Sequence, residues 1–402
     1  MSNNKNQLET ELIHAPSNSD VEQRTGAVNV PIYLSSTYHQ GSFDGFGPFD
    51  YSRSGNPTRQ ALEEKIAQLE EGARGLAFAS GMSAISSAFM LLSAGDHVLV
   101  STDVYGGTYR FVTEVLTKFK IDHTFADMTN LTEVNDAIKP NTKVIYIETP
   151  SNPCLNITDI RGIVKIAKAN DCLTFLDNTF MTPLYQKPIN LGVDIVLHSA
   201  TKFLSGHSDI IAGLAVTNTE ELGERLAFIQ NSFGSILGAQ DSYLLIQGIK
   251  TLGSRLKQSS ESALKIAAYL TNHPLIKNVF YPGLPNHPGH DLHNSQSKGS
   301  GAVLSFEIED SVAAKTFVEK IRLPVFAVSL GAVETILSYP ATMSHAAMPK
   351  KEREKRGISD GLFRFSVGLE HVDDLIADLD QALQAASQLE NLAFAKPLGE
   401  LP

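Results

Sequence analysis

A lysine and an aspartate, each following a short apolar run, offer the clearest chemistry in this chain. Lys202 stands shortly after the apolar run 193–197, in a stretch rich in hydroxyl groups and glycine. Asp177 ends a second apolar run, 173–176. A lysine can form a Schiff base with an aldehyde, and a carboxylate that ends a buried strand can hold a positive charge. Pyridoxal phosphate (PLP) needs both groups, one at its aldehyde and one at its ring nitrogen.

Both residues also have an ordinary structural interpretation. A Thr-Lys pair after an apolar run is usually a surface turn, and an aspartate at a strand end is usually a helix N-cap or turn residue. Spacing alone therefore leaves cofactor chemistry and a plain strand-end role open for Lys202 and Asp177.

The segment around Lys202 resembles the lysine signature of the Cys/Met-metabolism PLP-dependent enzymes. This family contains the cystathionine synthases and lyases, the methionine γ-lyases and their relatives. The resemblance follows the family's order over roughly residues 8 to 388. It rests on these further blocks: Tyr51-Ser52-Arg53-Ser54-Gly55-Asn56-Pro57-Thr58, Ser80-Gly81-Met82, Tyr105-Gly106-Gly107-Thr108, Glu148-Thr149-Pro150-Ser151-Asn152-Pro153 and Arg364-Phe365-Ser366-Val367-Gly368.

The apolar pattern agrees with an α/β fold. Short apolar runs alternate with stretches of helical period, which predicts a largely parallel sheet with helices on both faces. Ligands of such sheets bind beyond the carboxyl ends of the strands, where Asn152, Asp177 and Ser199 are expected. The resemblance implies the PLP-dependent transferase-like fold, as in aspartate aminotransferase, with a smaller α+β C-terminal domain.

Four regions are predicted along the chain. Residues 1–50 form an N-terminal arm without sustained periodicity, and the resemblance implies that it contacts a neighbouring subunit. The PLP-binding domain covers 51–248 and the C-terminal domain covers 249–390. Residues 391–402 are expected to form a frayed tail.

The resemblance assigns roles around the cofactor ring. Lys202 would bind the aldehyde of PLP, Asp177 its ring nitrogen and Asn152 its phenolic oxygen. The ring would stack on Tyr105, whose phenol would join Lys202 in proton transfer. Taken alone, the Tyr-Gly-Gly sequence at this tyrosine is more typical of a simple turn.

Other residues are assigned to the phosphate of PLP. Ser199 and Thr201 would donate hydroxyl groups, and Gly81 and Met82 would present backbone amides at the start of an apolar helix. Arg53, together with Tyr51, would bind the phosphate of a neighbouring subunit, so the active site would be shared. The resemblance then implies a dimer of dimers, whereas the residues alone also fit a solvated loop arginine.

Substrate binding is assigned to residues of the C-terminal half, together with Asn152. Arg364 lies between two phenylalanines in an apolar run and would bind the substrate α-carboxylate, or else form a buried ion pair. Ser329 would help to place that carboxylate and the lysine. Val328 stands where many γ-synthases and γ-lyases of the family carry a glutamate, and Gly107 stands where methionine γ-lyases carry a cysteine.

These two positions favour cystathionine β-lyase, which splits L-cystathionine into homocysteine, pyruvate and ammonia in methionine biosynthesis. A cystathionine γ-lyase or a γ-synthase that uses an O-acyl-homoserine is the alternative within the family. An aminotransferase of related fold or a non-catalytic protein that keeps the fold are the alternatives outside it.

Composition narrows the possible partners. The chain has 402 residues and a net charge of −11, which argues against nucleic acid. It has only two cysteines, no apolar stretch long enough for a membrane and no signal-peptide pattern, so a cytoplasmic protein is expected. The histidines at 287, 290 and 293 lack a carboxylate pattern, so no metal site is predicted. The expected partners are an amino-acid substrate and copies of the same chain.

Overall fold

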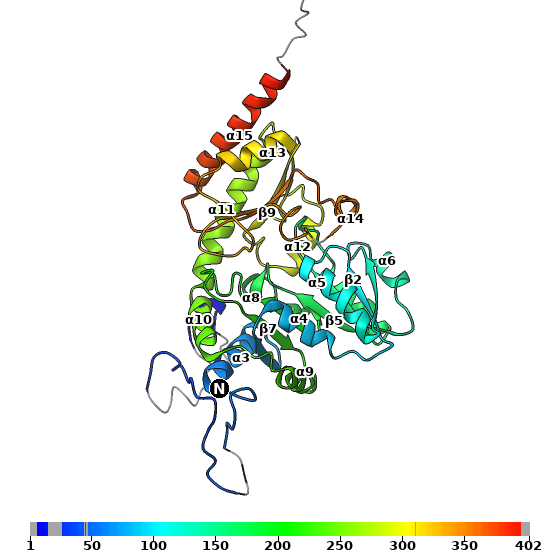
Figure 1. Cartoon of the computed structure of the whole chain (residues 1–402), viewed down its shortest axis with the longest axis vertical. Coiled ribbons are helices and arrows are strands. Elements are labelled where there is room, and N and C mark those ends of the chain that lie inside the picture. Colours follow the sequence, from blue (N-terminus) through cyan, green and yellow to red (C-terminus); the bar gives the residue numbers. More distant parts are fainter. Residues whose placement is uncertain are drawn as a thin grey trace, which may run out of the picture.

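The chain folds around two sheets, which Figure 1 shows one above the other. The computed structural model describes residues 6–14, 26–43, 45, 47–309, 311–346 and 348–394. The large domain (cyan and green) lies below the small domain (yellow to red) in this view. The two-domain α/β architecture agrees with the prediction from the sequence.

The large domain is built on a seven-stranded sheet with the order β1-β7-β6-β5-β4-β2-β3. Its strands are β1 Arg74–Phe78, β2 His97–Ser101, β3 Asp122–Ala126, β4 Thr142–Glu148, β5 Leu173–Asp177, β6 Ile195–Ser199 and β7 Gly213–Thr217. All neighbouring pairs from β6 through β5, β4 and β2 to β3 are parallel. Only β7 runs against both of its neighbours, because its connection from β6 contains no crossover helix.

Helices cover both faces of this sheet. Successive side chains of a strand point to opposite faces, and Val196 and Leu197 accordingly belong to different buried clusters. Helices α3, α6, α7 and α10 pack on one face, whereas α4, α5 and α9 pack on the other. Their bounds are α3 Pro57–Glu70, α4 Gly81–Phe89, α5 Gly106–Arg110, α6 Leu131–Asp136, α7 Ile160–Ala169, α8 Thr182–Tyr185, α9 Glu220–Phe233 and α10 Ala239–Lys250.

Helix α3 shows how local sequence sets the element boundaries. The Asn56 side chain accepts hydrogen bonds from the backbone of Thr58 and Arg59, and Pro57 occupies the first helical position. Leu62 and Ile66 then face the core at helical spacing. The Asn56 cap therefore sets the start of the helix at Pro57.

The small domain contains a five-stranded sheet with the order β10-β11-β12-β9-β8. Its strands are β8 Ile276–Phe280, β9 Val303–Ile308, β10 Val325–Phe326, β11 Ile336–Ser338 and β12 Leu362–Ser366. The accompanying helices are α11 Leu252–Thr271, α12 His290–Gln296, α13 Ser311–Lys320, α14 Lys350–Lys355 and α15 Val372–Phe394. Helix α11 joins the domains, since Leu256 belongs to the core of the large domain and Ile266 to that of the small one.

The N-terminal region contains more regular structure than the sequence predicted. Residues Leu8–Ile13 form helix α1, and Leu12 is buried in the core of the large domain. Beyond it, much of the described chain between residues 26 and 55 extends outward from the body (blue in Figure 1). The predicted contact between this arm and another subunit stays a prediction.

Strand β10 contains only two residues, since Ser329 adopts a φ of 83° and Gly331 a φ of 78°, which interrupt extended backbone beyond it. One boundary differs from the expectation. Residues 391–394, expected to be frayed, continue helix α15. The rest of the predicted tail lies outside the described residues.

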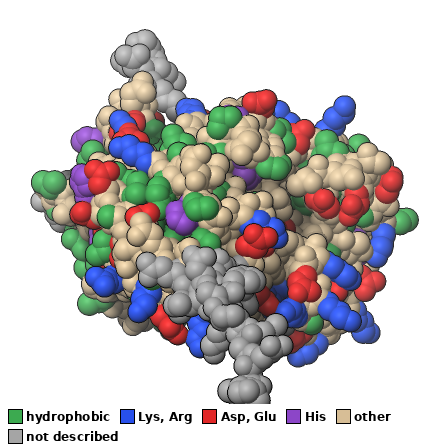
Figure 2. Space-filling model, turned by 90° about the horizontal axis from the view of Figure 1, so that it is seen from above, with side chains coloured by type: hydrophobic (Ala, Val, Ile, Leu, Met, Phe, Trp, Pro, Cys, Tyr) green, Lys and Arg blue, Asp and Glu red, His purple; other side chains and the backbone are tan. Residues whose placement is uncertain are grey.

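Acidic and basic side chains are interspersed among polar and hydrophobic ones on the face that Figure 2 shows. Within the described part of the chain, no helix is long and apolar enough to cross a bilayer.

Candidate active site

A cavity of about 600 Å³ lies between the two domains, at the carboxyl ends of the parallel strands. Its walls contain every predicted site residue except Tyr51 and Arg53: Gly81, Met82, Tyr105, Asn152, Asp177, Ser199, Thr201, Lys202, Val328, Ser329 and Arg364. The parallel strand order explains this convergence, because it brings the ends of β4, β5 and β6 to one edge of the sheet.

Lys202 projects into the cavity from the loop after β6. Its ammonium group donates a hydrogen bond to Ser329 Oγ at 2.6 Å, which joins the two domains. Removal from water, and to a lesser extent the positive charge of Arg364, lower the pKa of Lys202 to about 8. Near physiological pH, the fraction of Lys202 present as the neutral, nucleophilic amine is therefore larger than that of a surface lysine.

Asp177 ends β5 and is partly buried at the cavity wall. Its carboxylate accepts a hydrogen bond from the backbone N–H of Thr179 at 2.9 Å. Thr179 Oγ1 in turn accepts from the backbone N–H of Ser199 at 2.8 Å, so one threonine fixes the ends of both strands. Burial raises the pKa of Asp177, because its charged form is less stable away from water. A cationic partner in the cavity would stabilise that charged form.

The start of helix α4 lies directly against the end of β6. The Ser80 side chain accepts from the Ser83 backbone N–H at 3.0 Å and caps the helix. A β-carbon at Gly81 would lie 2.8 Å from Cβ of Ser199, so only glycine permits this approach. Helix N–H groups and a serine hydroxyl therefore share one small space, which suits a phosphate.

Tyr105 forms the cavity wall before helix α5 and is 43% exposed. The following glycines leave room for its ring and for the small domain. A β-carbon at Gly107 would lie 2.5 Å from the Tyr105 ring, and one at Gly106 would lie 2.2 Å from the backbone oxygen of Ser344.

Arg364 is buried in β12, with 3% of its surface exposed. Its guanidinium donates to Asn152 Oδ1 at 3.0 Å, to the Ser329 backbone oxygen at 2.6 Å and to Ser338 Oγ at 3.1 Å. Within the described residues it forms no ion pair, and its Nε has no hydrogen-bond partner. Burial lowers the pKa of Arg364 to about 10. A buried cation without a carboxylate partner is suited to an anionic ligand.

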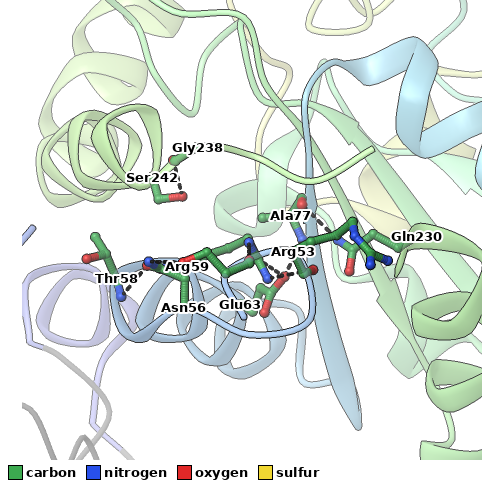
Figure 3. Close-up of polar contacts among 10 residues, drawn as sticks. Arg53, Asn56, Thr58, Arg59, Glu63, Ala77, Gln230, Gly238 and Ser242 are labelled. Carbon is green, nitrogen blue, oxygen red and sulfur yellow. Dashed lines mark hydrogen bonds and ion pairs between the residues drawn. The ribbon is translucent and has the colours of Figure 1, made fainter. Parts of the chain in front are cut away.

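Tyr51 and Arg53 do not line the cavity of their own chain. Arg53 donates to the backbone and side-chain oxygens of Asn231, both at 2.8 Å, and lies over the Tyr51 ring. Figure 3 shows Arg53 beside the start of helix α3. In the same view Gln230 of α9 donates to the backbone oxygen of Ala77 in β1. Both Tyr51 and Arg53 are exposed in the single chain.

Glu148 also lines the cavity, although no function was predicted for this carboxylate from the sequence. It ends β4 and lies beside Asp177 in the parallel register. The rule that strand ends converge would have identified it, because it directly precedes the Thr-Pro turn after β4. The three histidines considered for a metal do not join any group of potential ligands, since the described residues contain no such cluster.

The cavity fits PLP in its chemistry. It offers a lysine with a lowered pKa, a carboxylate for a ring cation and a helix start for a phosphate. It also contains an exposed tyrosine ring and a buried guanidinium that lacks an anionic partner. When bound, PLP supplies an electron sink for the carbon that loses a proton.

Comparison with known proteins supports the same chemistry. The chain is 65% identical over 377 residues to the cystathionine beta-lyase of Bacillus subtilis (strain 168). This match covers 94% of this chain and 96% of that protein. The chain is 51% identical over 375 residues to the cystathionine gamma-lyase of the same strain, covering 93% of this chain and 98% of that protein.

A solved structure agrees with these relatives. The cystathionine gamma-lyase of Lactobacillus plantarum, complexed with L-serine, superposes with a TM-score of 0.92 and 48% identity. The match covers 95% of this chain and 100% of that one. The family described as Cys/Met metabolism PLP-dependent enzyme matches residues 9–384. The chain therefore belongs to the Cys/Met-metabolism PLP-dependent enzymes.

Proposed function

We propose that the protein cleaves L-cystathionine by β-elimination, releasing homocysteine, pyruvate and ammonia, as a step of methionine biosynthesis. The observation that carries the choice of reaction is the apolar cavity rim at Val328, which directly precedes Ser329 and is 64% exposed. Many γ-synthases and γ-lyases of the family carry a glutamate at this position, where it can meet the distal ammonium of a long substrate, whereas this chain carries valine. The high identity to a beta-lyase supports the same choice.

The side chains divide the work as follows. Arg364, held by Asn152 and the Ser329 backbone, binds the substrate α-carboxylate in a forked geometry. Asp177 would hold the positive charge on the ring nitrogen of bound PLP. Lys202, with Tyr105 beside it at the cavity wall, would remove the α-proton. The β C–S bond would then break, with a proton going to the leaving sulfur of homocysteine, and the remaining three-carbon fragment would take up water to give pyruvate and ammonia.

The pKa of Lys202 leads to a prediction for the protein without its cofactor. Because only the neutral amine attacks an aldehyde, the rate of PLP capture should rise with pH and level off above about 8, rather than near 10.5. Stopped-flow absorbance of the apoprotein mixed with PLP, over a pH series, gives the midpoint. A midpoint at the value of free lysine would mean that burial does not alter this amine.

We further propose that the active site is shared between subunits of a dimer, with two dimers in the assembly. Arg53 and Tyr51 are exposed and stand outside their own cavity, which leaves them available to a neighbouring copy. Their guanidinium and phenol suit the phosphate of PLP. The two free cysteines are buried and unpaired, which agrees with a cytoplasmic location for this assembly.

Complementation tests the shared site. Arg53→Ala and Lys202→Ala should each be nearly inactive, but each mixed dimer should recover about half of wild-type activity, since one of its two sites is intact, and a random equimolar mixture about a quarter. The measurement is activity after subunit exchange, with exchange verified by native mass spectrometry. Verified hybrids without recovered activity would mean that each site takes both residues from one subunit.

The reaction type is tested with the substrates of the alternatives. The protein should consume L-cystathionine and should not form it from O-acetyl- or O-succinyl-homoserine and cysteine. Val328→Glu restores a carboxylate at the rim and should raise the ratio of 2-oxobutyrate to pyruvate several-fold, as an ion pair at a partly exposed site contributes about 1 kcal/mol. Val328→Gln is the matched control of similar size. Equal ratios in both variants would show that a carboxylate at residue 328 does not influence which C–S bond breaks.

A further inference from the structure

Glu148 is the carboxyl group of the cavity wall that the proposed reaction does not use. It is 6% exposed and ends β4, beside Asp177 of β5 in the parallel register. Both residues contribute to the same cavity wall. Two carboxyl groups at adjacent strand ends would repel each other if both were charged, so the position calls for a physical reason.

The contacts of Glu148 lead to Tyr105. Both carboxyl oxygens accept from the Tyr105 backbone N–H, at 3.0 and 3.1 Å. Tyr105 is the N-cap of helix α5 and its own side chain makes no capping hydrogen bond. Glu148 therefore supplies, from a neighbouring strand, the acceptor for the N–H that opens this turn.

Fixing this backbone also fixes the ring. The Tyr105 ring lies against Gly107, where even a β-carbon would come within 2.5 Å. The same β-carbon would lie 3.0 Å from the sulfur of Met82. The ring is thus closely bounded on this side, and a shift of the Tyr105 Cα changes where it lies in the cavity.

The charges of the two carboxyl groups are divided unequally. Burial, followed by the charge of Asp177, raises the pKa of Glu148 well above its usual range. Asp177 has a stabilising hydrogen bond from the Thr179 N–H and is also favoured by the nearby His198. Burial raises the pKa of Asp177 as well, but these contacts oppose it, so Asp177 is better placed than Glu148 to carry the negative charge.

We propose that Glu148 is a positioning residue: its carboxyl oxygens accept from the Tyr105 backbone N–H and so fix the backbone of Tyr105 at the cofactor ring. This inference rests on the proposed function of the cavity as a PLP site. It assigns no proton transfer to Glu148 itself.

The test uses the PLP-loaded protein and compares Glu148→Gln, Glu148→Asp and Glu148→Ala. Glutamine keeps a neutral acceptor at the same distance, whereas aspartate is shorter and alanine removes the acceptor. The first readout is circular dichroism of the bound cofactor in the visible range, which reports the asymmetry of its surroundings. The second is the pH at which the visible absorption of the cofactor changes, and the third is kcat/KM.

Glu148→Ala and Glu148→Asp should reduce the visible dichroism severalfold and lower kcat/KM by about 10²-fold, the size expected for a displaced catalytic group. Glu148→Gln should restore the dichroism and most of kcat/KM, with the pH midpoint of the wild type. Asp194→Ala is the matched control, because Asp194 accepts from Thr174 and Asn218 at the opposite ends of the strands. It should leave the visible dichroism unchanged.

Two results would overturn the proposal. One is a Glu148→Ala or Glu148→Asp protein, folded by far-ultraviolet dichroism, with wild-type visible dichroism and kcat/KM. The other is a Glu148→Gln protein as impaired as Glu148→Ala, or with a shifted pH midpoint, which would mean that Glu148 acts through a negative charge. A wild-type protein that binds no PLP would instead contradict the proposed function, so the two failures are distinct.

Discussion

Lys202→Ala is expected to lower kcat for cystathionine cleavage by about 10⁴-fold, the upper range for loss of a general base. The same substitution removes the amine that binds the cofactor's aldehyde. The structure gives both reasons at one atom, since the Lys202 ammonium group lies in the cavity with Ser329 and has a pKa of about 8. PLP should still bind to the variant through its phosphate and ring contacts, but reversibly.

The measurement combines turnover with covalent trapping. After treatment with borohydride, mass spectrometry should find the cofactor attached to the wild-type peptide that contains Lys202 and absent from the variant. Lys187→Ala is the matched control, because Lys187 pairs with Glu71 away from the cavity. Trapping on the Lys202→Ala protein would show that another lysine binds the cofactor.

Arg364→Ala should lower kcat/KM for L-cystathionine by about 10²- to 10³-fold, as expected when one member of a buried, hydrogen-bonded charge pair is truncated. Most of the loss should lie in KM, because the α-carboxylate is held equally in the ground state and the transition state. The substitution also removes the donors to Asn152 and Ser329, so a smaller effect on kcat is expected from their misplacement.

Arg364→Lys separates charge from geometry. Lysine keeps the positive charge but not the planar fork, so its KM should lie between those of the wild type and the alanine variant. Steady-state kinetics with L-cystathionine give the split. An unchanged KM in the Arg364→Ala variant would show that Arg364 does not bind the substrate.

The strand-end residues could be predicted because parallel strands bring their carboxyl ends together. Lys202 and Asp177 each follow an apolar run, and this pattern survives in a single sequence. Arg364 was identifiable for a related reason, since a charged residue between two phenylalanines of a buried strand is rarely without a partner. The two-domain division followed from the change in pattern after the large sheet.

Other features depended on packing that the sequence does not display. Strand β3, Asp122–Ala126, begins with three consecutive polar residues, so it lacks the alternation of apolar and polar residues that predicts a strand. It is defined by its pairing with β2. Glu148 was present in a recognised block, but its contact with Tyr105 requires the loops after β2 and β4 to meet. The short strand β10 ends early because of backbone angles at Ser329 that residue type alone does not reveal.

The N-terminal region shows the same limit. Helix α1 has only three apolar residues, Leu8, Leu12 and Ile13, too few to display a period, yet it buries Leu12 between α3, α10 and α11. Arg53 was assigned to a phosphate by resemblance, whereas the single chain shows it bound to Asn231. Arg53 can bind the phosphate of a neighbouring copy only if it gives up its contact with Asn231 when the two copies associate. The complementation experiment tests whether it serves the neighbouring site.

The central claim is that the C–S bond on the β-side of cystathionine is the one that breaks. The most direct measurement is the identity of the keto acid formed from L-cystathionine by the purified PLP-loaded protein, separated by chromatography, with Lys202→Ala as the blank. Pyruvate is expected in an amount equal to homocysteine. A predominance of 2-oxobutyrate together with cysteine would contradict it.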